Sequence, residues 1–246
     1  MKAMILAAGY GTRLKPLTNR LPKALVKIAG TTLLEIVISK LIKIGVSEII
    51  INTHHFAEMM QQFLIEKKYF GIRIEISYEP TILGTGGGLK KALYFFDDEE
   101  PFILHNVDVI SDIDLLEMIR YHKHNSALST LAIQNRDTTR YLLFDSTNQL
   151  CGRRDVVSNK AELVKKPENA PQMVAFNGIH VLSPNIFKFM ENEGFFSIID
   201  TYLICAARGE KIMGFFMEDQ YWKDVGKLPD LKAVERDIQK GKIIIQ

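Results

Sequence analysis

Apolar residues alternate between strand-like and helix-like spacing through the first half of the chain. We expect strands at Met4–Ala7, Glu48–Asn52, Arg73–Tyr78 and Phe102–His105, where apolar residues are contiguous or recur at every second position. We expect helices at Thr32–Ile44, Phe56–Lys67, Leu89–Phe96 and Leu115–His124. Strands and helices that alternate at this spacing predict an α/β fold, in which helices cover both faces of a mostly parallel central sheet.

The second half of the chain has longer runs of β character. Strands are expected at Leu128–Gln134, Tyr141–Phe144 and Val174–Leu182, which we interpret as added antiparallel strands, and a further strand is expected at Ile212–Met217. Helices are expected to begin at Ser183-Pro184 and to span Ser197–Arg208 and Pro229–Gln239. No linker, low-complexity tract or internal repeat divides the chain, so we expect one domain over 1–246, with halves at about 1–125 and 126–246.

Charge and cysteine content exclude several classes of protein. A net charge of +2, from 31 basic and 29 acidic residues, gives no support for a nucleic-acid or membrane-surface partner. Only Cys151 and Cys205 are present, and neither a signal peptide nor an apolar run of about 18 residues is found. We therefore expect a cytoplasmic protein without a disulfide framework, either a monomer or a small homo-oligomer.

Polar residues follow three of the expected strands. They are the loop at Gly9, the turn Asn52-Thr53-His54 and the segment Asn106-Val107-Asp108. Because ligands of open α/β sheets bind beyond the carboxyl ends of the strands, we expect these segments to converge on one crevice. A turn without a ligand remains the alternative for each segment taken alone.

The loop after the first strand has the composition of a phosphate-binding site. Gly9 and Gly11 allow close approach of backbone N–H groups, and Arg13 and Lys23 supply positive charge. The loop is neither a GxGxxG dinucleotide fingerprint nor a Walker A motif, which excludes a Rossmann dehydrogenase and a P-loop NTPase. The six histidines lack zinc-ligand spacing, and no GxSxG or cysteine-nucleophile context occurs.

The whole first segment, L-A-A-G-x-G-T-R-L-x-P-L-T-x-x-x-P-K, resembles the signature of the sugar-phosphate nucleotidyltransferases, the nucleoside-diphosphate-sugar pyrophosphorylases. The resemblance covers nearly the whole chain and implies the Rossmann-like nucleotide-diphospho-sugar transferase fold. It further implies that the loop wraps a nucleotide and that Arg13 and Lys23 neutralise its phosphates. The nucleotide-binding positions implied here are Ala8, Gly9, Gly11, Thr12, Arg13 and Lys23.

Two aspartates are the candidate metal ligands. Asp108 follows an apolar strand, and Asp224 lies in Tyr221-Trp222-Lys223-Asp224-Val225-Gly226. Carboxylates at such places can hold a hard cation, although a lone aspartate there also serves as a helix cap or turn residue. The family resemblance implies that both carboxylates bind the Mg²⁺ cofactor, and that they act in catalysis with Arg13 and Lys23.

Further segments resemble the rest of the family site. Leu83-Gly84-Thr85-Gly86-Gly87-Gly88 opens a helix, and the resemblance assigns Thr85, Gly86 and Gly87 to the nucleobase. Ala175-Phe176-Asn177-Gly178 resembles the segment that meets the sugar, which makes Asn177 and Gly178 candidates, with a strand bulge at Gly178 as the alternative. Lys166, in Val164-Lys165-Lys166-Pro167, is the candidate for the sugar phosphate.

The resemblance implies Mg²⁺-dependent nucleotidyl transfer from a nucleoside triphosphate (NTP) to a sugar-1-phosphate. Short members of the family act on N-acetylmuramate-1-phosphate, mannose-1-phosphate or heptose-1-phosphate. One alternative is a phosphocholine cytidylyltransferase of the same fold, which would need an aromatic cage from residues such as Tyr141, Phe176, Tyr221 and Trp222. Another alternative is a non-catalytic regulatory protein that binds nucleotide sugars.

Overall fold

The computed structural model describes residues 1–217 and 219–245 as a mixed α/β protein with a central, mostly parallel sheet and helices. This confirms the expected fold class. The chain forms two compact units. The first comprises Met1–Leu83, Leu104–Ile113 and Gln220–Gln246, and the second comprises Gly84–Ile103 and Asp114–Asp219. The division of one domain into halves near residue 125 stays a prediction.

The first unit contains the parallel strands. They are β1 (Lys2–Leu6), β4 (Glu48–Thr53) and β5 (Arg73–Tyr78), and the end of β6 (Phe102–Asn106) lies beside β1. Two short antiparallel pairs complete the unit, formed by β2 (Lys27–Ile28) with β3 (Thr31–Thr32) and by β7 (Val109–Ser111) with β14 (Trp222–Asp224). The parallel register sends the carboxyl ends of β1 and β4 to the same edge, as expected.

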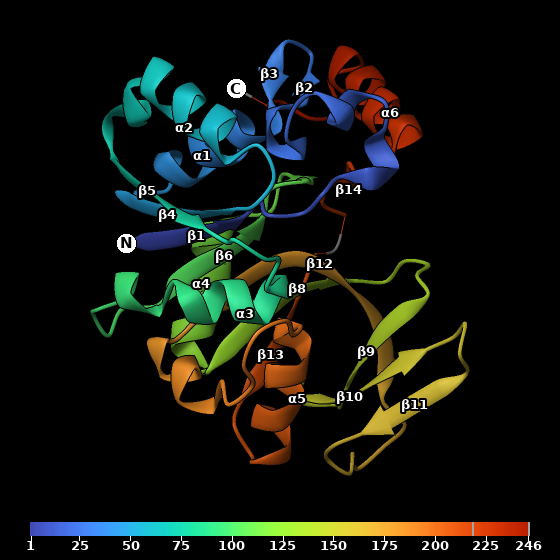
Figure 1. Ribbon diagram of the computed structural model, residues 1–246. Helices are drawn as coiled ribbons and strands as arrows, with labels where there is room; N and C mark the ends of the chain where they lie inside the picture. Colours follow the sequence, from blue (N-terminus) through green and yellow to red (C-terminus); the bar gives the residue numbers. More distant parts are fainter. Residues whose placement is uncertain (218, 246) are drawn as a thin grey trace. The chain divides into compact units, whose positions relative to one another are not determined.

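Among the described residues, three α-helices belong to this unit, namely α1 (Leu33–Lys43), α2 (Ala57–Glu66) and α6 (Leu228–Gln239). Figure 1 shows α1 and α2 on one side of the parallel strands. Thr32 caps α1, because its hydroxyl oxygen accepts a hydrogen bond from Glu35 N at 3.1 Å. Gly45, with φ +88°, follows the end of α1 in the left-handed conformation that glycine favours, as the sequence predicts.

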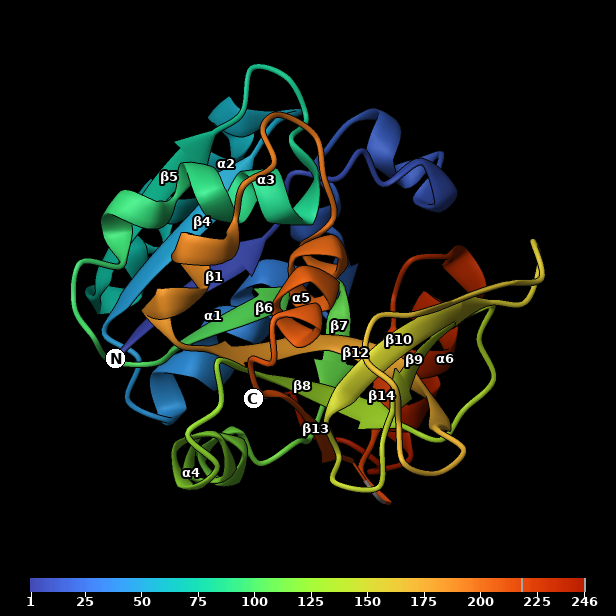
Figure 2. The same cartoon turned by 90° about the horizontal axis from the view of Figure 1, so that it is seen from below.

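The second unit carries the added strands, seen from below in Figure 2. They are β8 (Ser129–Gln134), β9 (Arg140–Phe144), β10 (Leu150–Asp155), β11 (Lys160–Leu163), β12 (Gln172–Leu182) and β13 (Ile212–Phe216). β12 pairs antiparallel with β8 and with β9, whereas β13 is parallel to β8. The register between β12 and β8 shifts between Phe176 and His180, and Gly178 has φ +74° there, so the bulge named as the alternative is present.

The helices of this unit are α3 (Gly84–Lys91), α4 (Leu115–His124) and α5 (Ile198–Ala207), and a 3-10 helix follows Ser183 at Pro184–Phe189. The expected helix Leu89–Phe96 is wrong in its bounds. α3 begins at Gly84, ends at Lys91 and is followed by a 3-10 turn at Leu93–Phe95.

Contacts within the unit explain why this glycine-rich segment becomes helical. Gly86 N donates to Phe196 O at 3.0 Å, and Thr85 Oγ1 accepts from Ile198 N at 2.9 Å. A Cβ at Gly86 would lie 2.3 Å from the Phe196 ring. Only glycine therefore allows this approach, and the tertiary contacts outweigh the low helix propensity of glycine.

Both units bury a continuous set of apolar side chains. In the first unit Met4, Ile5, Leu33 and Ile50 are fully buried between β1, β4 and α1. Among the described residues, no helix has the length and apolar character needed to cross a membrane.

A buried histidine in α4 makes the stability of the fold depend on pH. His122 is 2% exposed and contacts Thr130 Oγ1 at 2.9 Å. Burial lowers the pKa of His122 from 6.5 to about 4, and the charge of Lys123 contributes to the lowering. As the pH falls below 6.5, the unfolded chain takes up a proton that the folded protein does not accept until about pH 4, so stability decreases with pH.

We therefore expect His122 to remove about 2 kcal/mol of unfolding free energy between pH 7 and pH 5. Urea unfolding of the wild type and of His122→Gln at both pH values measures this contribution. The variant starts from lower stability because it alters a buried hydrogen bond, but it should lose about 2 kcal/mol less than the wild type over this interval. If the wild type and His122→Gln lost equal unfolding free energy over this interval, His122 would not be the source of the pH dependence.

Candidate active site

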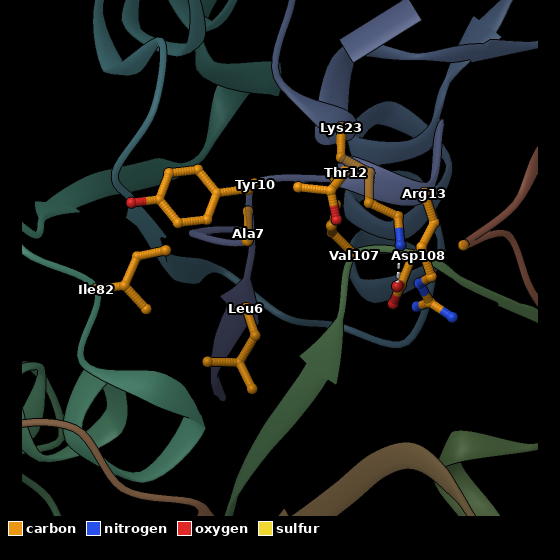
Figure 3. Close-up of a pocket in the computed structure, with 12 residues that line it drawn as sticks. Leu6, Ala7, Tyr10, Thr12, Arg13, Lys23, Ile82, Val107 and Asp108 are labelled. Carbon is orange, nitrogen blue, oxygen red and sulfur yellow. Dashed lines mark hydrogen bonds and ion pairs between the residues drawn. The ribbon is translucent and has the colours of Figure 1, made fainter. Parts of the chain in front are cut away.

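A pocket of about 370 Å³ lies in the first unit, at the carboxyl end of β1. Its lining residues come from the end of β1 and the first loop, from the segments after β5 and β6, and from the segment after β14; they are Leu6, Ala7, Gly9, Tyr10, Gly11, Thr12, Arg13, Lys23, Ile82, Val107, Asp108 and Gly226. Figure 3 shows Arg13, Lys23 and Asp108 gathered at one end and Tyr10 and Ile82 at the other. The pocket thus has a charged end and an end with an aromatic and an aliphatic wall.

The first loop is held in a tight conformation around Gly11. Gly11 has φ +64°, and Thr18 Oγ1 donates to its carbonyl at 2.8 Å. A Cβ at Gly11 would lie 2.9 Å from Thr18 Cγ2 and 3.1 Å from Lys23 Cβ, so only glycine fits here. This packing brings Lys23, which is buried, back to the loop that carries Arg13.

The two candidate metal ligands, distant in sequence, are brought together by β7 and β14. In this antiparallel pair Asp224 faces Val109, and Val225 N donates to Asp108 O at 2.8 Å. Asp108 also forms an ion pair with Lys23 (Figure 3). Asp108 and Lys23 therefore line one end of the pocket, and Asp224 lies beside them without lining it.

Arg13 lies at the same end of the pocket, where Gly226 leaves room because it has no side chain. A Cβ at Gly226 would lie 2.7 Å from Arg13 Nη2 and 2.8 Å from Asp224 Oδ1. Burial raises the pKa of the Asp224 carboxyl and the charge of Asp108 raises it further, whereas Lys23 and Arg13 oppose this shift. Two carboxylates and two cations thus lie close together, with Lys23 buried, Asp108 and Asp224 half-buried and Arg13 exposed.

The residues present fit a hard divalent cation. Asp224 Oδ1 is buried and has no hydrogen-bond partner among the described residues. Within residues 1–217 and 219–245, no group of three or more His, Cys, Asp or Glu side chains gathers around a point. Mg²⁺ is commonly held by one or two carboxylates together with substrate phosphates and water, so a pair of aspartates suits a site completed by substrate.

Ala8 lies buried in the first loop and does not line the pocket. The other predicted site residues lie in the second unit. Thr85 and Gly86 contact the segment before α5, as described above, and Gly87 is buried in α3. Asn177 is fully buried, and its Oδ1 accepts from Arg136 Nε at 3.1 Å. Gly178 forms the bulge of β12, and Lys166 is exposed after β11. Their roles toward nucleobase and sugar stay predictions.

Sequence reasoning missed Tyr10, Ile82 and Arg136. Tyr10 and Ile82 line the pocket, but both are ordinary residues of a loop in the sequence. Arg136 follows β8 and also donates from Nη2 to Phe176 O at 2.9 Å, so it holds the β12 bulge that contains Asn177. The position of Tyr10 between two motif glycines is the one signal that could have drawn attention to it.

Comparison with known proteins identifies the family. The model of the nucleotidyl transferase family matches residues 2–241. Mannose-1-phosphate guanyltransferase beta-B of Xenopus laevis is 30% identical over 236 residues, and mannose-1-phosphate guanyltransferase of Yarrowia lipolytica is 33% identical over 235 residues. Both alignments cover 94% of this chain but only 62% of the relative. The chain belongs to the nucleotidyl transferase family, and the resemblance stated from its motifs is confirmed.

Solved structures support the fold. HddC from Yersinia pseudotuberculosis, complexed with GMP-PN, superposes with a TM-score of 0.76 at 21% identity and covers 96% of this chain and 99% of its own. A UDP-glucose pyrophosphorylase complexed with UDP-glucose superposes with a TM-score of 0.77 at 18% identity and covers 98% of both chains. The fold of this chain is therefore that of the nucleotide-diphospho-sugar transferases.

Proposed function

We propose that the protein transfers a nucleoside monophosphate from an NTP to a sugar-1-phosphate in a Mg²⁺-dependent reaction that yields an NDP-sugar and pyrophosphate. The observation that carries the proposal is that Arg13, Lys23 and Asp108 line one end of the pocket, with Asp224 beside them. This set combines cations for phosphates with carboxylates for a metal ion. The family of the chain and its mannose-1-phosphate guanyltransferase relatives support the same reaction.

The reaction requires positioning and charge neutralisation rather than a covalent enzyme intermediate. A phosphate oxygen of the acceptor attacks the α-phosphorus in line; a new P–O bond forms as the bond to the departing pyrophosphate breaks. Arg13 and Lys23 bind the phosphates that leave and stabilise their negative charge. Asp108 and Asp224 would hold Mg²⁺, which when bound offsets the charge on the phosphoryl oxygens.

The names of the relatives provide a proposal for the two substrates. Because the relatives are named for mannose-1-phosphate and guanylyl transfer, GTP with mannose-1-phosphate is the first pair to test. N-acetylmuramate-1-phosphate and heptose-1-phosphate are the next acceptors. We also propose a cytoplasmic protein, a monomer or small homo-oligomer, without a nucleic-acid or membrane partner, which accords with its balanced charge.

A substrate panel tests the proposal. Pyrophosphate release is measured for ATP, CTP, GTP and UTP, each with a series of sugar-1-phosphates and with phosphocholine. We expect release that requires both a sugar-1-phosphate and Mg²⁺. Release only from CTP with phosphocholine would instead support a phosphocholine cytidylyltransferase, and no release from any pair would support a regulatory protein.

A further inference from the structure

Lys23 and Asp108 are a candidate phosphate-binding group and a candidate metal ligand, yet they bond to each other. The ammonium of Lys23 donates to Asp108 Oδ2, and the two side chains are only 10% and 20% exposed. Water therefore screens this ion pair poorly, and the two charges attract each other more strongly than they would in a surface pair. While the pair is intact, an ammonium holds Asp108 Oδ2 and neutralises the charge of the carboxylate.

The backbone of each partner is fixed, so a side chain has to move for the pair to separate. Asp108 O accepts from Val225 N at 2.8 Å, which ties Asp108 to the end of β14. Lys23 begins the short 3-10 helix Lys23–Leu25, and its carbonyl accepts from Val26 N at 3.0 Å. A lysine has a flexible four-carbon stem and three donors on its ammonium, so it can change partner while its backbone stays in place.

The first loop offers the Lys23 ammonium a second position. Lys23 Cβ lies 3.1 Å from the place that a Cβ on Gly11 would take, so the lysine stem starts directly beside the loop backbone. Lys23, Gly11 and Asp108 all line the pocket (Figure 3). An anion bound against the loop would compete with Asp108 for the same ammonium, and a triphosphate carries more negative charge than one carboxylate.

The charges around the pair oppose the entry of either ligand alone. Burial raises the pKa of the Asp224 carboxyl, and the charge of Asp108 raises it further. Lys23 and Arg13 act in the opposite direction, so two carboxylates and two cations balance here. The cations would repel a divalent metal ion that enters alone, and the carboxylates would repel a triphosphate that enters alone. Metal ion and triphosphate together supply the opposite charge that each lacks.

We propose that Lys23 is an internal counter-ion of the metal site, which holds Asp108 until the triphosphate draws its ammonium away and thereby makes metal binding depend on nucleotide binding. Once released, Asp108 can hold the metal ion together with Asp224, whose Oδ1 is buried without a partner among the described residues. The coupling is reciprocal, so the metal ion strengthens nucleotide binding by the same factor. The inference rests on the proposed function in one respect, because it takes the anion to be an NTP.

Binding of Mn²⁺ without nucleotide tests the first half of the proposal. Mn²⁺ shares the preference of Mg²⁺ for oxygen ligands, and electron paramagnetic resonance measures its free concentration. Lys23→Met removes the ammonium but keeps an apolar stem, and it should bind Mn²⁺ about tenfold more tightly than the wild type. Lys27→Met, at an exposed lysine of β2, is the control for loss of one positive charge and should stay within about twofold. In the Asp108→Asn background the gain from Lys23→Met should fall below about threefold, because the partner of Lys23 is already gone.

Binding of nucleotide without metal tests the second half. Calorimetry in EDTA measures the Kd of GTP, or of the NTP that the wild type binds most tightly. Asp108→Asn should bind this NTP about tenfold more tightly than the wild type, because Lys23 no longer has to leave a carboxylate. Asp230→Asn, in α6, is the control for loss of one negative charge and should stay within about twofold. In the Lys23→Met background the gain from Asp108→Asn should fall below about threefold.

Three results would overturn the role of Lys23. They are Mn²⁺ binding by Lys23→Met no tighter than by the wild type, gains that are equal with and without the partner side chain, and metal-free NTP binding by Asp108→Asn no tighter than by the wild type. Thermal unfolding shows whether each variant folds. Lys23→Gln replaces Lys23→Met if the latter does not fold, and Asp108→Asn in EDTA decides if neither does. The Mn²⁺ measurement uses no nucleotide, so a wild type that releases no pyrophosphate would contradict the transfer reaction and not the role of Lys23.

Discussion

Asp224→Asn and Asp108→Asn should each lower kcat by at least about tenfold, equivalent to about 1.4 kcal/mol of activation free energy. Each substitution keeps the shape of the side chain but removes a negative charge that would hold Mg²⁺. Asp224 Oδ1 is buried and unpartnered among the described residues, so its oxygen is poised for a ligand from outside the protein. Pyrophosphate release at saturating substrates and varied Mg²⁺ measures the effect.

The matched control is Asp230→Asn, in the first turn of α6. Asp230 has the weakest effect of the four charges that act on the pKa of Asp224, so the variant should keep kcat within about twofold. A higher Mg²⁺ requirement in Asp108→Asn and Asp224→Asn would further support these two carboxylates as the metal ligands. Full Mg²⁺-dependent activity in both Asp108→Asn and Asp224→Asn would show that the metal assignment is wrong.

Gly226→Ala should lower kcat/KM by about ten- to a hundredfold while the protein keeps its fold. The added methyl group would occupy space now filled by Arg13 Nη2 and Asp224 Oδ1, at 2.7 and 2.8 Å. Both atoms are ends of flexible side chains, so they move and the backbone does not. Displacement of a reacting group by about 1 Å can reduce the rate on the order of a hundredfold.

Steady-state kinetics and thermal unfolding of Gly226→Ala separate function from stability. We expect Tm within a few degrees of wild type together with the loss of kcat/KM. Lys227→Ala, at the exposed next residue, is the control and should change neither quantity. An alanine variant with wild-type kcat/KM would contradict the placement of Arg13 and Asp224 around Gly226.

The first loop could be predicted from the sequence because its chemistry is local. Gly11, Arg13 and Lys23 lie within one short segment, and the turn after β6 follows an apolar strand that ends shortly before Asp108. The strands β1, β4 and β5 were likewise predictable from apolar runs, with ends that differ by at most two residues. The pairing of β7 with β14 could not be predicted, because two three-residue strands far apart in sequence leave no periodic pattern.

Two other features depend on tertiary contacts that no local pattern contains. The hairpin of β10 and β11 was missed because Lys160–Leu163 is exposed throughout and lacks apolar alternation. A hydrogen-bond network that joins Asn52, His54 and Glu79 was missed because these residues look like ordinary turn residues until the hydrogen bonds to Ala7 and Leu83 are seen.

The most direct test of the central claim is a ³¹P NMR time course of the wild-type protein with Mg²⁺, GTP and mannose-1-phosphate, extended to the other NTPs and acceptors if this pair is inert. Nucleotidyl transfer predicts that the signals of triphosphate and sugar phosphate decline together while a sugar-linked diphosphate and pyrophosphate grow in equal amounts. Hydrolysis of the nucleotide without a new sugar-linked diphosphate, or no reaction with any pair, would contradict the account.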